Sequence, residues 1–334
     1  MDAPQRPIAQ DSAAFAPFLR TVARGAHLSR PLSAAEAEDA MDRILARAVA
    51  PEQLGAFLMV LRYRKEAPEE LAGFVRAARR RFARSGGLEA DLDWPSYADR
   101  HRQLPYFALA AKLLAANGVR VAMHGLDGVG PATTRKALAA MDMPAAAAFD
   151  AARRHLDRSN FAYLPLEAFC PDLQALFDLR PLFGLRSAAN TFARMLNPAA
   201  APCQMQGVFH PTYIGTHIES ARLLGQPSAA VFKGGGGEVQ RNPDKACRVA
   251  ALADGAVGEA EWPALTPSNR YAWRDDDLDP ARLAALWRGD RTDPSPVAAV
   301  TGTVAVALKL LGRAETMDAA EALAREMWES RSKG

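Results

Sequence analysis

Residues 105–125 read PYFALAAKLLAANGVRVAMHG, and this stretch decides the fold class. Pro105 suits the first turn of a helix, and Gly118 is a typical residue just after a helix end. The β-prone run Val119–Met123 follows directly, and another short strand is predicted upstream at Leu92–Pro95. Because a strand, a helix and a strand follow one another, we predict an α/β fold with a parallel sheet.

The same alternation continues along the chain. We predict further strands at Ala162–Leu164 and Ala229–Phe232, and helices at Ser187–Met195, Val297–Leu311 and Met317–Ser330. The first 90 or so residues differ because their patterns are helical only. Ser33 opens a capping box, and Pro51 and Pro68 suit first helical positions. The prediction is a mostly parallel central sheet flanked by helices, with a separate helical N-terminal domain.

The predicted domain boundaries follow from this division. Residues 1–12 are expected to form a disordered tail, and residues 13–88 the helical domain, which helices near 183–205 join. Residues 89–182 and 206–334 are expected to form the α/β domain. A chain of 334 residues is long enough for two such domains.

The composition excludes several classes of protein. Hydrophobic residues make up 49% of the chain, enough for a large core, and a net charge of +3 does not by itself indicate nucleic acid. The three cysteines, at positions 170, 203 and 247, show no zinc-ligand spacing and indicate a reducing compartment. The N-terminus lacks a signal core, and the apolar run Pro296–Leu311 is short for a membrane span. We therefore expect a cytoplasmic protein with no membrane partner.

A row of four glycines marks the segment Val231–Pro243, which reads VFKGGGGEVQRNP. Such a row is tolerated mainly where the backbone turns sharply or approaches another group closely. After a strand, its bare amide groups can hold an anion, and flanking cations add positive charge. The alternative is a flexible surface hairpin. The phosphate-binding residues predicted here are Lys233, Gly234, Gly235, Gly236, Gly237 and Arg241.

The helix predicted from Pro68 carries a row of arginines. Arg76, Arg80 and Arg84 repeat every four residues, which places them about 6 Å apart on one helix face. Like charges at this spacing repel, so the row costs stability unless an anion or an acidic partner lies against it. Two interpretations stay open: the three arginines bind phosphate, or acidic residues of another helix neutralise them.

Other basic and aromatic residues fall near the predicted carboxyl ends of the strands, where α/β proteins bind ligands. The basic residues are Arg100, Arg102, Lys245 and Arg248, and the candidates for base stacking are Tyr97, Tyr106, Phe107 and Phe232, the last two expected in the core. His124 is a candidate phosphate contact, and the alternative is a hydrogen-bonded turn histidine. His210 and His217 show no standard metal-ligand spacing.

Four parts of the sequence resemble the anthranilate phosphoribosyltransferase-like family (glycosyltransferase family 3), which is grouped with the pyrimidine nucleoside phosphorylases. The matching segments are Gly55–Arg62 with Pro68–Gly73 ("GAFLMALR…TPEEIAG"), Gly118–Gly125 ("GVKVAKHG"), Leu182–Pro198 ("LGIRTIFNxxGPLxNP") and Gly207–Gly234 (the approach to "HGxGLDE"). The resemblance covers nearly the whole chain. It implies a fold of the nucleoside phosphorylase/phosphoribosyltransferase type and a homodimer formed through the N-terminal helices.

The segments that carry the family's chemistry are changed in this sequence. The family's diphosphate loop, Gly-Thr-Gly-Gly-Asp, is replaced by Trp94–Arg102, which contains no glycine. The family's adjacent Asp-Glu pair is replaced by Glu238 and Val239, which leaves one carboxylate as a weak magnesium ligand. Arg180 matches the family's acceptor-binding arginine, whereas Cys170 stands where a histidine is usual.

Lys233–Glu238 and Asp93–Pro105 resemble a divergent branch of the family that includes nucleic-acid-binding homodimers. The first hypothesis is therefore a homodimer that binds single- or double-stranded nucleic acid, such as DNA, without sequence specificity and without a cofactor. The alternative is a glycosyl- or phosphoribosyltransferase with altered donor and acceptor. In it Ser96, Arg100 and the glycine row hold the donor phosphate, and Glu238 holds magnesium. A nucleotide sensor is a third possibility, and no residue is singled out as catalytic.

Overall fold

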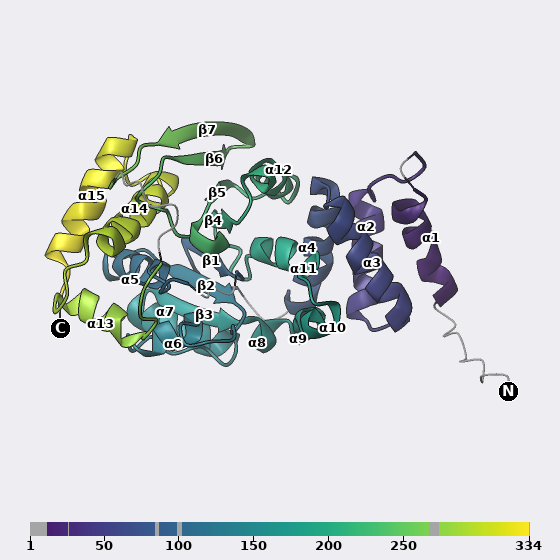
Figure 1. The fold of residues 1–334 in the computed structure, drawn as a ribbon, viewed down its shortest axis with the longest axis horizontal. Helices are drawn as coiled ribbons and strands as arrows, with labels where there is room; N and C mark the ends of the chain where they lie inside the picture. The colour runs from purple at the N-terminus through teal and green to yellow at the C-terminus, as the bar shows by residue number, and fades with distance from the viewer. Residues whose placement is uncertain (1–11, 26, 84–86, 99–101, 267–273, 334) are drawn as a thin grey trace. The chain divides into compact units, whose positions relative to one another are not determined.

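The computed structural model describes residues 12–25, 27–83, 87–98, 102–266 and 274–333 (Figure 1). The chain divides into two compact units. Met1–Arg84 and Cys170–Leu196 form the first, which we call the helical unit, and Ser85–Phe169 and Asn197–Gly334 form the second, the α/β unit. The sequence places the return to the helical unit near residues 183–205, and the structure groups Cys170–Leu196 with it.

The helical unit is built from short helices with an aromatic core. Its helices are α1 (Ser12–Ala23), α2 (Ala34–Leu45), α3 (Pro51–Arg64), α4 (Pro68–Phe82), α9 (Pro171–Phe177), α10 (Arg180–Phe183), α11 (Ala189–Phe192) and the 3-10 turn η1 (Ala193–Met195). Phe57 on α3 packs edge-on against Phe15 on α1 and Phe74 on α4. Phe192 extends this row at 5.5 Å from Phe74, so the returning segment contributes to the same core.

The predicted helix starts of this unit are confirmed. Ser33 forms the capping box with Glu36, because each side chain accepts a hydrogen bond from the other residue's backbone N–H. Pro51 and Pro68 occupy the first positions of α3 and α4, where a missing N–H costs nothing. Local sequence signals therefore set these helix boundaries.

The α/β unit contains a seven-stranded sheet in the order β3-β2-β1-β4-β5-β6-β7. Its strands are β1 (Leu92–Ser96), β2 (Val121–Gly125), β3 (Phe161–Pro165), β4 (Cys203–Val208), β5 (Ser228–Lys233), β6 (Cys247–Ala253) and β7 (Ala256–Trp262). The first five are parallel, and β6 and β7 are antiparallel. The predicted α/β fold with a mostly parallel sheet is confirmed, and each of the four predicted strands overlaps a strand of this sheet.

Helices cover both faces of this sheet (Figure 1). They are α5 (Phe107–Ala116), α6 (Thr134–Ala139), α7 (Phe149–Ser159), α8 (Leu166–Phe169), α12 (Ile214–Leu223), α13 (Ala281–Arg288), α14 (Pro294–Leu310) and α15 (Met317–Ser330), with 3-10 turns η2 (Pro211–Tyr213) and η3 (Gly235–Gly237). Along β5, Ala230 and Phe232 face the large core that includes α5 and α14, whereas Ala229 and Val231 face the smaller core under α12. This two-sided burial explains the unbroken apolar run.

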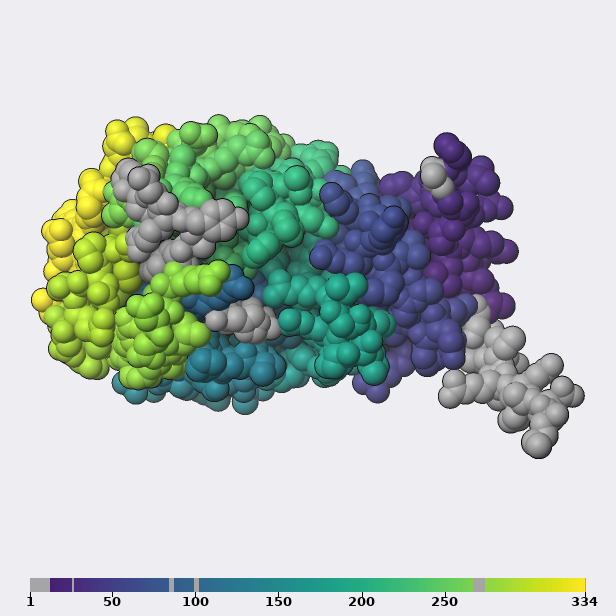
Figure 2. All heavy atoms as spheres, in the orientation of Figure 1, coloured from purple at the N-terminus to yellow at the C-terminus, as the bar shows by residue number. Residues whose placement is uncertain are grey.

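The C-terminal helices complete the large core of the α/β unit. All but the ends of α14 is buried, and α15 packs against it with Ala320, Ala324 and Met327. The other face of α15 is exposed, and Figure 2 shows this helix in yellow at the surface. Within the described residues no helix is both long enough and apolar enough to span a bilayer.

The β6–β7 hairpin is the main element that the sequence analysis did not predict. Asp254 and Gly255 form its two-residue turn with φ angles of 49° and 78°, the left-handed backbone that such hairpins require. An Asp-Gly pair between two β-prone runs is the signal that could have revealed it. The hairpin ends the parallel part of the sheet beside β5.

Candidate functional site

The sheet order places the candidate site at the carboxyl ends of β1 and β4. From β1 the chain builds the sheet outward through β2 and β3 on one side, and through β4 and β5 on the other (Figure 1). Ligands of open α/β sheets bind where the strand order reverses in this way. The loops that follow β1 and β5 meet at this edge, through a hydrogen bond between Ala98 and Glu238.

The glycine row after β5 forms a compact turn whose amides are largely used within the protein. Gly236 and Gly237 have φ angles of +66° and +88°. The N–H groups of Gly234, Gly235 and Gly237 donate to the carbonyls of Val208, Gln240 and Gly234, respectively. The prediction of a row of bare amides for an anion is therefore wrong for these three glycines. A phosphate at this loop would therefore have to be held mainly by side chains.

Close approach of the backbone explains why glycine is needed at two positions around this turn. A Cβ on Gly234 would lie 1.6 Å from the carbonyl oxygen of Glu238, and a Cβ on Gly207 would lie 2.1 Å from the same atom. No side chain can replace hydrogen at such distances without moving the backbone. The glycines thus allow the row to fold back over the end of β4 and to fix Glu238.

Glu238 links the two loops rather than presenting a metal site. Its side chain is 2% exposed, and one carboxylate oxygen accepts the N–H of Ala98 at 2.5 Å. The next residue, Val239, is fully buried in the large core, so no second carboxylate stands beside it. Among the described residues no three His, Cys, Asp or Glu side chains gather in a way that could hold a metal ion. The residues present therefore do not fit the paired-carboxylate magnesium site that the family resemblance implies.

A cavity of about 450 Å³ lies on the outer side of the glycine row. Its lining residues are Gln103, Pro211, Ile214, Lys233, Gly234, Gly235, Gly236, Asn242, Lys245, Ala246, Cys247, Arg248 and Glu261. The lining includes three cations, all exposed at the surface, and one carboxylate: Lys233, Lys245, Arg248 and Glu261. The second carboxylate nearby, on Glu259, lies 3.7 Å from the guanidinium of Arg248. The net positive lining suits a phosphorylated ligand.

The described residues that line the cavity include no activated nucleophile. Cys247 is its one thiol, and burial raises the pKa of this thiol to about 11, so it stays protonated at neutral pH. The chemistry available to the lining is therefore binding and charge stabilisation by cations and amides.

A second, much smaller cavity of about 20 Å³ is lined by hydroxyl groups and by Glu238. Ser96, at the end of β1, is 2% exposed and shares a hydrogen bond of 2.8 Å with Thr134. Thr133 caps α6 and lines the same cavity. Ser96 was predicted to hold phosphate, and the structure places it in this cavity, whose volume holds little more than a water molecule.

Two predicted phosphate ligands lie in the interior instead. Arg241 is fully buried, donates to Glu321 at 2.8 Å, and stacks its guanidinium 5.2 Å from the ring centre of Trp262. His124 is also fully buried, with Nδ1 2.8 Å from the hydroxyl of Tyr97. The prediction that these two residues contact phosphate is wrong, because the fold itself uses both.

The aromatic residues considered for base stacking are core residues. Tyr97, Tyr106, Phe107 and Phe232 are each 3% exposed or less, so their ring faces are not open to a nucleotide. The hydroxyl of Tyr106 donates to Asp275 at 3.0 Å, and burial together with this carboxylate raises the pKa of Tyr106. The expectation that Phe107 and Phe232 are in the core is confirmed.

The arginine row on α4 is at least partly neutralised. Arg80 forms ion pairs with Glu38 and Asp42 of α2. For this residue the second interpretation is correct, namely that acidic residues of another helix neutralise the arginine. Arg76 is half-buried. Arg84 and Arg100 lie outside the described residues, and Arg102 and Arg180 are exposed, the latter at the start of α10.

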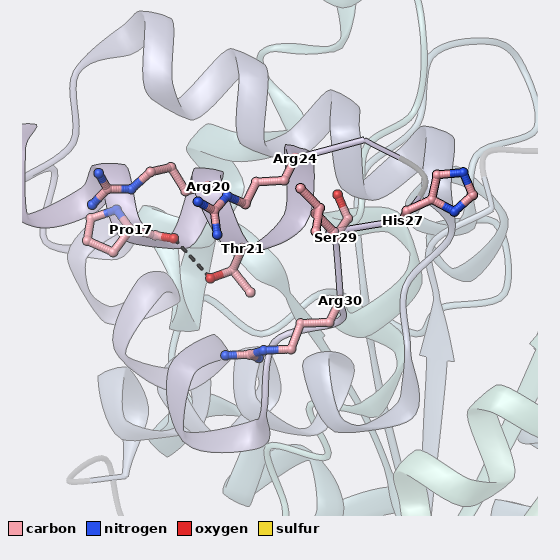
Figure 3. A pocket seen from close by; sticks show the side chains of 8 residues that line it. Pro17, Arg20, Thr21, Arg24, His27, Ser29 and Arg30 are labelled. Carbon is pink, nitrogen blue, oxygen red and sulfur yellow. Dashed lines mark hydrogen bonds between the residues drawn. The ribbon is translucent and has the colours of Figure 1, made fainter.

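The helical unit contains a cavity that the sequence did not reveal. It measures about 630 Å³ and lies between the end of α1 and the loop that leads to α2. Figure 3 shows Arg20, Arg24 and Arg30 around it. Arg30 makes a bidentate ion pair with Glu36, both contacts at 2.7 Å, and together with the Ser33 amide it lowers the pKa of Glu36 to about 2. Because Glu36 neutralises Arg30, the positive charge of this cavity comes from Arg20 and Arg24.

Comparison with known proteins decides the family. The model of the "glycosyl transferase family, helical bundle domain" matches residues 16–82, and that of the "glycosyl transferase family, a/b domain" matches residues 107–331. The chain belongs to this glycosyl transferase family. The anthranilate phosphoribosyltransferase of Moorella thermoacetica is 32% identical over 248 residues, which are 71% of this chain and 69% of that protein. The enzyme of the same name from Erwinia tasmaniensis is 28% identical over 75% of both chains.

Solved structures show the same fold. The anthranilate phosphoribosyltransferase of Thermus thermophilus superposes with a TM-score of 0.79 at 24% identity, over 90% of this chain and 92% of that one. The Saccharomyces cerevisiae enzyme in complex with PRPP and Mg gives a TM-score of 0.74 at 15% identity, over 95% and 94%. The Moorella thermoacetica and Erwinia tasmaniensis proteins, which are similar in sequence, are named for phosphoribosyl transfer. They therefore support the transferase hypothesis better than the first hypothesis of a nucleic-acid-binding protein.

Proposed function

We propose that this chain is a transferase that takes a phosphorylated sugar, such as phosphoribosyl diphosphate (PRPP), as its donor. The observation that carries the proposal is the cationic cavity beside the glycine row, in a chain whose family relatives are phosphoribosyltransferases. Lys233, Lys245 and Arg248 would hold the phosphates. They would replace the glycine-rich diphosphate loop and the paired carboxylates, neither of which this chain has.

The reaction that such a site supports is substitution at the anomeric carbon of the sugar. The bond between this carbon and the diphosphate breaks, the electron pair leaves with the diphosphate, and a nucleophilic atom of the acceptor forms the new bond. Cations beside the leaving group stabilise the negative charge that develops on it. Lys233 and its neighbours would fill this role without a proton transfer of their own.

The acceptor is proposed to differ from anthranilate. Cys170 replaces the histidine that is usual in the family, and the side chain is fully buried, with a pKa raised to about 11 by burial. A neutral, buried thiol cannot make the hydrogen bonds of an exposed imidazole. Arg180 stays the proposed contact for an acidic group of the acceptor.

Phosphorus NMR of the wild-type protein with PRPP and a panel of acceptors tests this function. Acceptor-dependent release of diphosphate is the expected result. Calorimetry with PRPP separates binding from turnover, because a donor that binds without release would indicate a nucleotide or sugar-phosphate sensor. Absence of both binding and release at millimolar donor would contradict the proposal.

Nucleic-acid binding is a second candidate, favoured by the exposure of the same cations. Arg102 and the three cavity cations are exposed, and the cavity of the helical unit adds Arg20 and Arg24. An oligonucleotide that contacts such residues should bind with an affinity that falls steeply with salt, because counterions are released. Fluorescence anisotropy with a labelled single strand and with a duplex measures this. Competition by PRPP would show that both ligands use the cavity, and no binding at low salt would rule this candidate out.

A homodimer is also proposed, as the family resemblance implies. Large apolar side chains are exposed on the helical unit: Leu28 (69%), Tyr63 (93%), Leu182 (81%) and Leu185 (57%). Apolar side chains that are exposed on a single chain can be covered in an assembly. Light scattering coupled to gel filtration would give twice the chain mass of 36.0 kDa if the proposal is right.

A further inference from the structure

One face of the central strands is polar although it is buried. Asp93 on β1, His124 on β2, and Gln204 and Gln206 on β4 are each exposed by 1% or less. Side chains alternate along a strand, so these four lie opposite the face that packs residues such as Met205 into the large core. Parallel strands are normally apolar on both faces, and unpaired polar groups in such a place are costly.

Hydrogen bonds connect these side chains in series, and in each bond the donor residue lies farther from Asp93 along the series than the acceptor residue. Nδ1 of His217, on α12, lies 2.7 Å from Oε1 of Gln206 and must donate to it, because an amide oxygen only accepts. Nε2 of Gln206 donates to Oε1 of Gln204, and Nε2 of Gln204 donates to Oδ2 of Asp93, both at 2.7 Å. Every donor in this line therefore points toward the Asp93 carboxylate.

The other side of Asp93 leads to the candidate site. Oδ1 of Asp93 lies 3.3 Å from Nε2 of His124, a charge contact whose geometry falls short of a hydrogen bond, and Nδ1 of His124 lies 2.8 Å from the hydroxyl of Tyr97. A carboxylate oxygen this close to Nε2 favours a proton on that nitrogen over a lone pair, and Nδ1 then accepts from Tyr97. The next residue, Ala98, donates its amide to Glu238. The line thus ends at the contact that joins the two loops of the site.

We propose that this line, the Asp93 relay, is a positioning device. It consists of His217, Gln206, Gln204, Asp93, His124 and Tyr97. The relay fixes His124 as the Nε2–H tautomer, and this tautomer orients Tyr97 and the loop after β1 against Glu238. Apolar side chains of similar size would stabilise the sheet at least as well as buried polar ones. What the polar line adds is a defined donor and acceptor in each hydrogen bond, and a carboxylate that faces Nε2 of His124.

Asp93→Asn tests the relay, because the direction of the line dictates the outcome. Gln204 still needs an acceptor, so the Asn carbonyl turns to it and the Asn amide N–H₂ faces Nε2 of His124. His124 must then accept at Nε2, and its proton moves to Nδ1. Long-range proton–nitrogen NMR of histidine-labelled protein, with the His124 signals assigned by a His124→Gln variant, should show Nε2–H in the wild type and Nδ1–H in Asp93→Asn.

A double variant provides the matched control. Gln204→Met removes the donor that holds the Asn, so in Asp93→Asn/Gln204→Met the amide can turn its carbonyl to His124. The Nε2–H tautomer should return. A wild-type protein with Nδ1–H, or an Asp93→Asn variant with an unchanged tautomer, would overturn the relay. The wild-type spectrum alone decides this even where a variant does not fold.

The consequence for the site rests on the proposed function and has its own readout. Inorganic diphosphate should bind Asp93→Asn about tenfold more weakly than the wild type, the effect of about one lost hydrogen bond. The double variant should recover the wild-type affinity. A flipped tautomer with unchanged affinity would contradict the positioning role. Failure of the wild type to bind diphosphate would contradict the proposed function instead. The NMR measurement of the His124 tautomer would still test the Asp93 relay in that case.

Discussion

Lys233 and Arg241 stand on the two sides of one glycine row, and the fold gives them opposite tasks. Lys233 is exposed and lines the cationic cavity. Arg241, eight residues later, is fully buried and paired with Glu321 beneath the same loop. A buried cation that pairs with a largely buried carboxylate maintains the structure, and an exposed cation at a cavity can bind a ligand. The predictions below test this division.

The largest effect is expected for the buried cation. Arg241→Ala leaves the carboxylate of Glu321, which is 12% exposed, without its partner, and should lower the free energy of unfolding by about 3–5 kcal/mol. Chemical denaturation measures this. Arg241→Met combined with Glu321→Leu should recover most of the loss, because it removes both charges. Unchanged stability in Arg241→Ala would show that Arg241 does not hold the loop.

The next effect concerns the glycine row that separates the two cations. Gly234→Ala places a Cβ against the Glu238 carbonyl and should cost about 1–3 kcal/mol of stability, as other cases of overpacking do. Gly215→Ala on α12 is the control, since a Cβ there meets nothing within 4 Å. Equal thermal stability of the two variants would mean that the row is not packed as described.

A smaller effect, on binding alone, is expected for the exposed cation. Lys233→Ala should weaken diphosphate binding about tenfold, or about 1.4 kcal/mol, since a hydrogen bond to a charged group is lost. Its stability should change by less than about 0.5 kcal/mol, as for other surface positions. Lys309→Ala, an exposed lysine on α14 that lines neither of the two α/β-unit cavities described above, should change neither quantity. Loss of stability in Lys233→Ala would show that Lys233, like Arg241, maintains the structure.

The smallest effect depends on pH and concerns a buried acid of the helical unit. Burial raises the pKa of Glu66, which is 4% exposed. The folded state therefore holds this proton more tightly than the unfolded chain does, and stability falls as pH rises above the ordinary value of 4.5. Glu66→Gln should be more stable than the wild type at pH 7 and equal to it near pH 4. Parallel stability curves for the two proteins would contradict the raised pKa.

Local and periodic signals allowed much of the fold to be predicted. Ser33 and the two prolines gave helix starts, and short β-prone segments between predicted helices and loops gave four of the parallel strands. The hairpin Cys247–Trp262 was missed although its Asp-Gly turn was visible. Membership of the returning segment in the helical unit depends on distant contacts, such as that of Phe192, which no local pattern contains.

The site was harder to predict because a charge in the sequence carries no information on its burial. Lys233 and Arg241 look alike in sequence, and only the packing of α14 and α15 separates them. His124 was considered as a turn histidine, but its partner Asp93 lies 31 positions away and was not identified. Gln204 and Gln206 do leave a signal, since two amides at alternating positions of a buried strand are unusual.

Calorimetry of PRPP binding in the presence of a chelator tests the central claim most directly, namely that cationic side chains have replaced the glycine loop and the metal pair as the phosphate-binding groups. We predict one saturable site for the wild type that persists without divalent cations and is lost in Lys233→Ala/Lys245→Ala. Binding that requires Mg²⁺ and is unaffected by the two substitutions would contradict the claim.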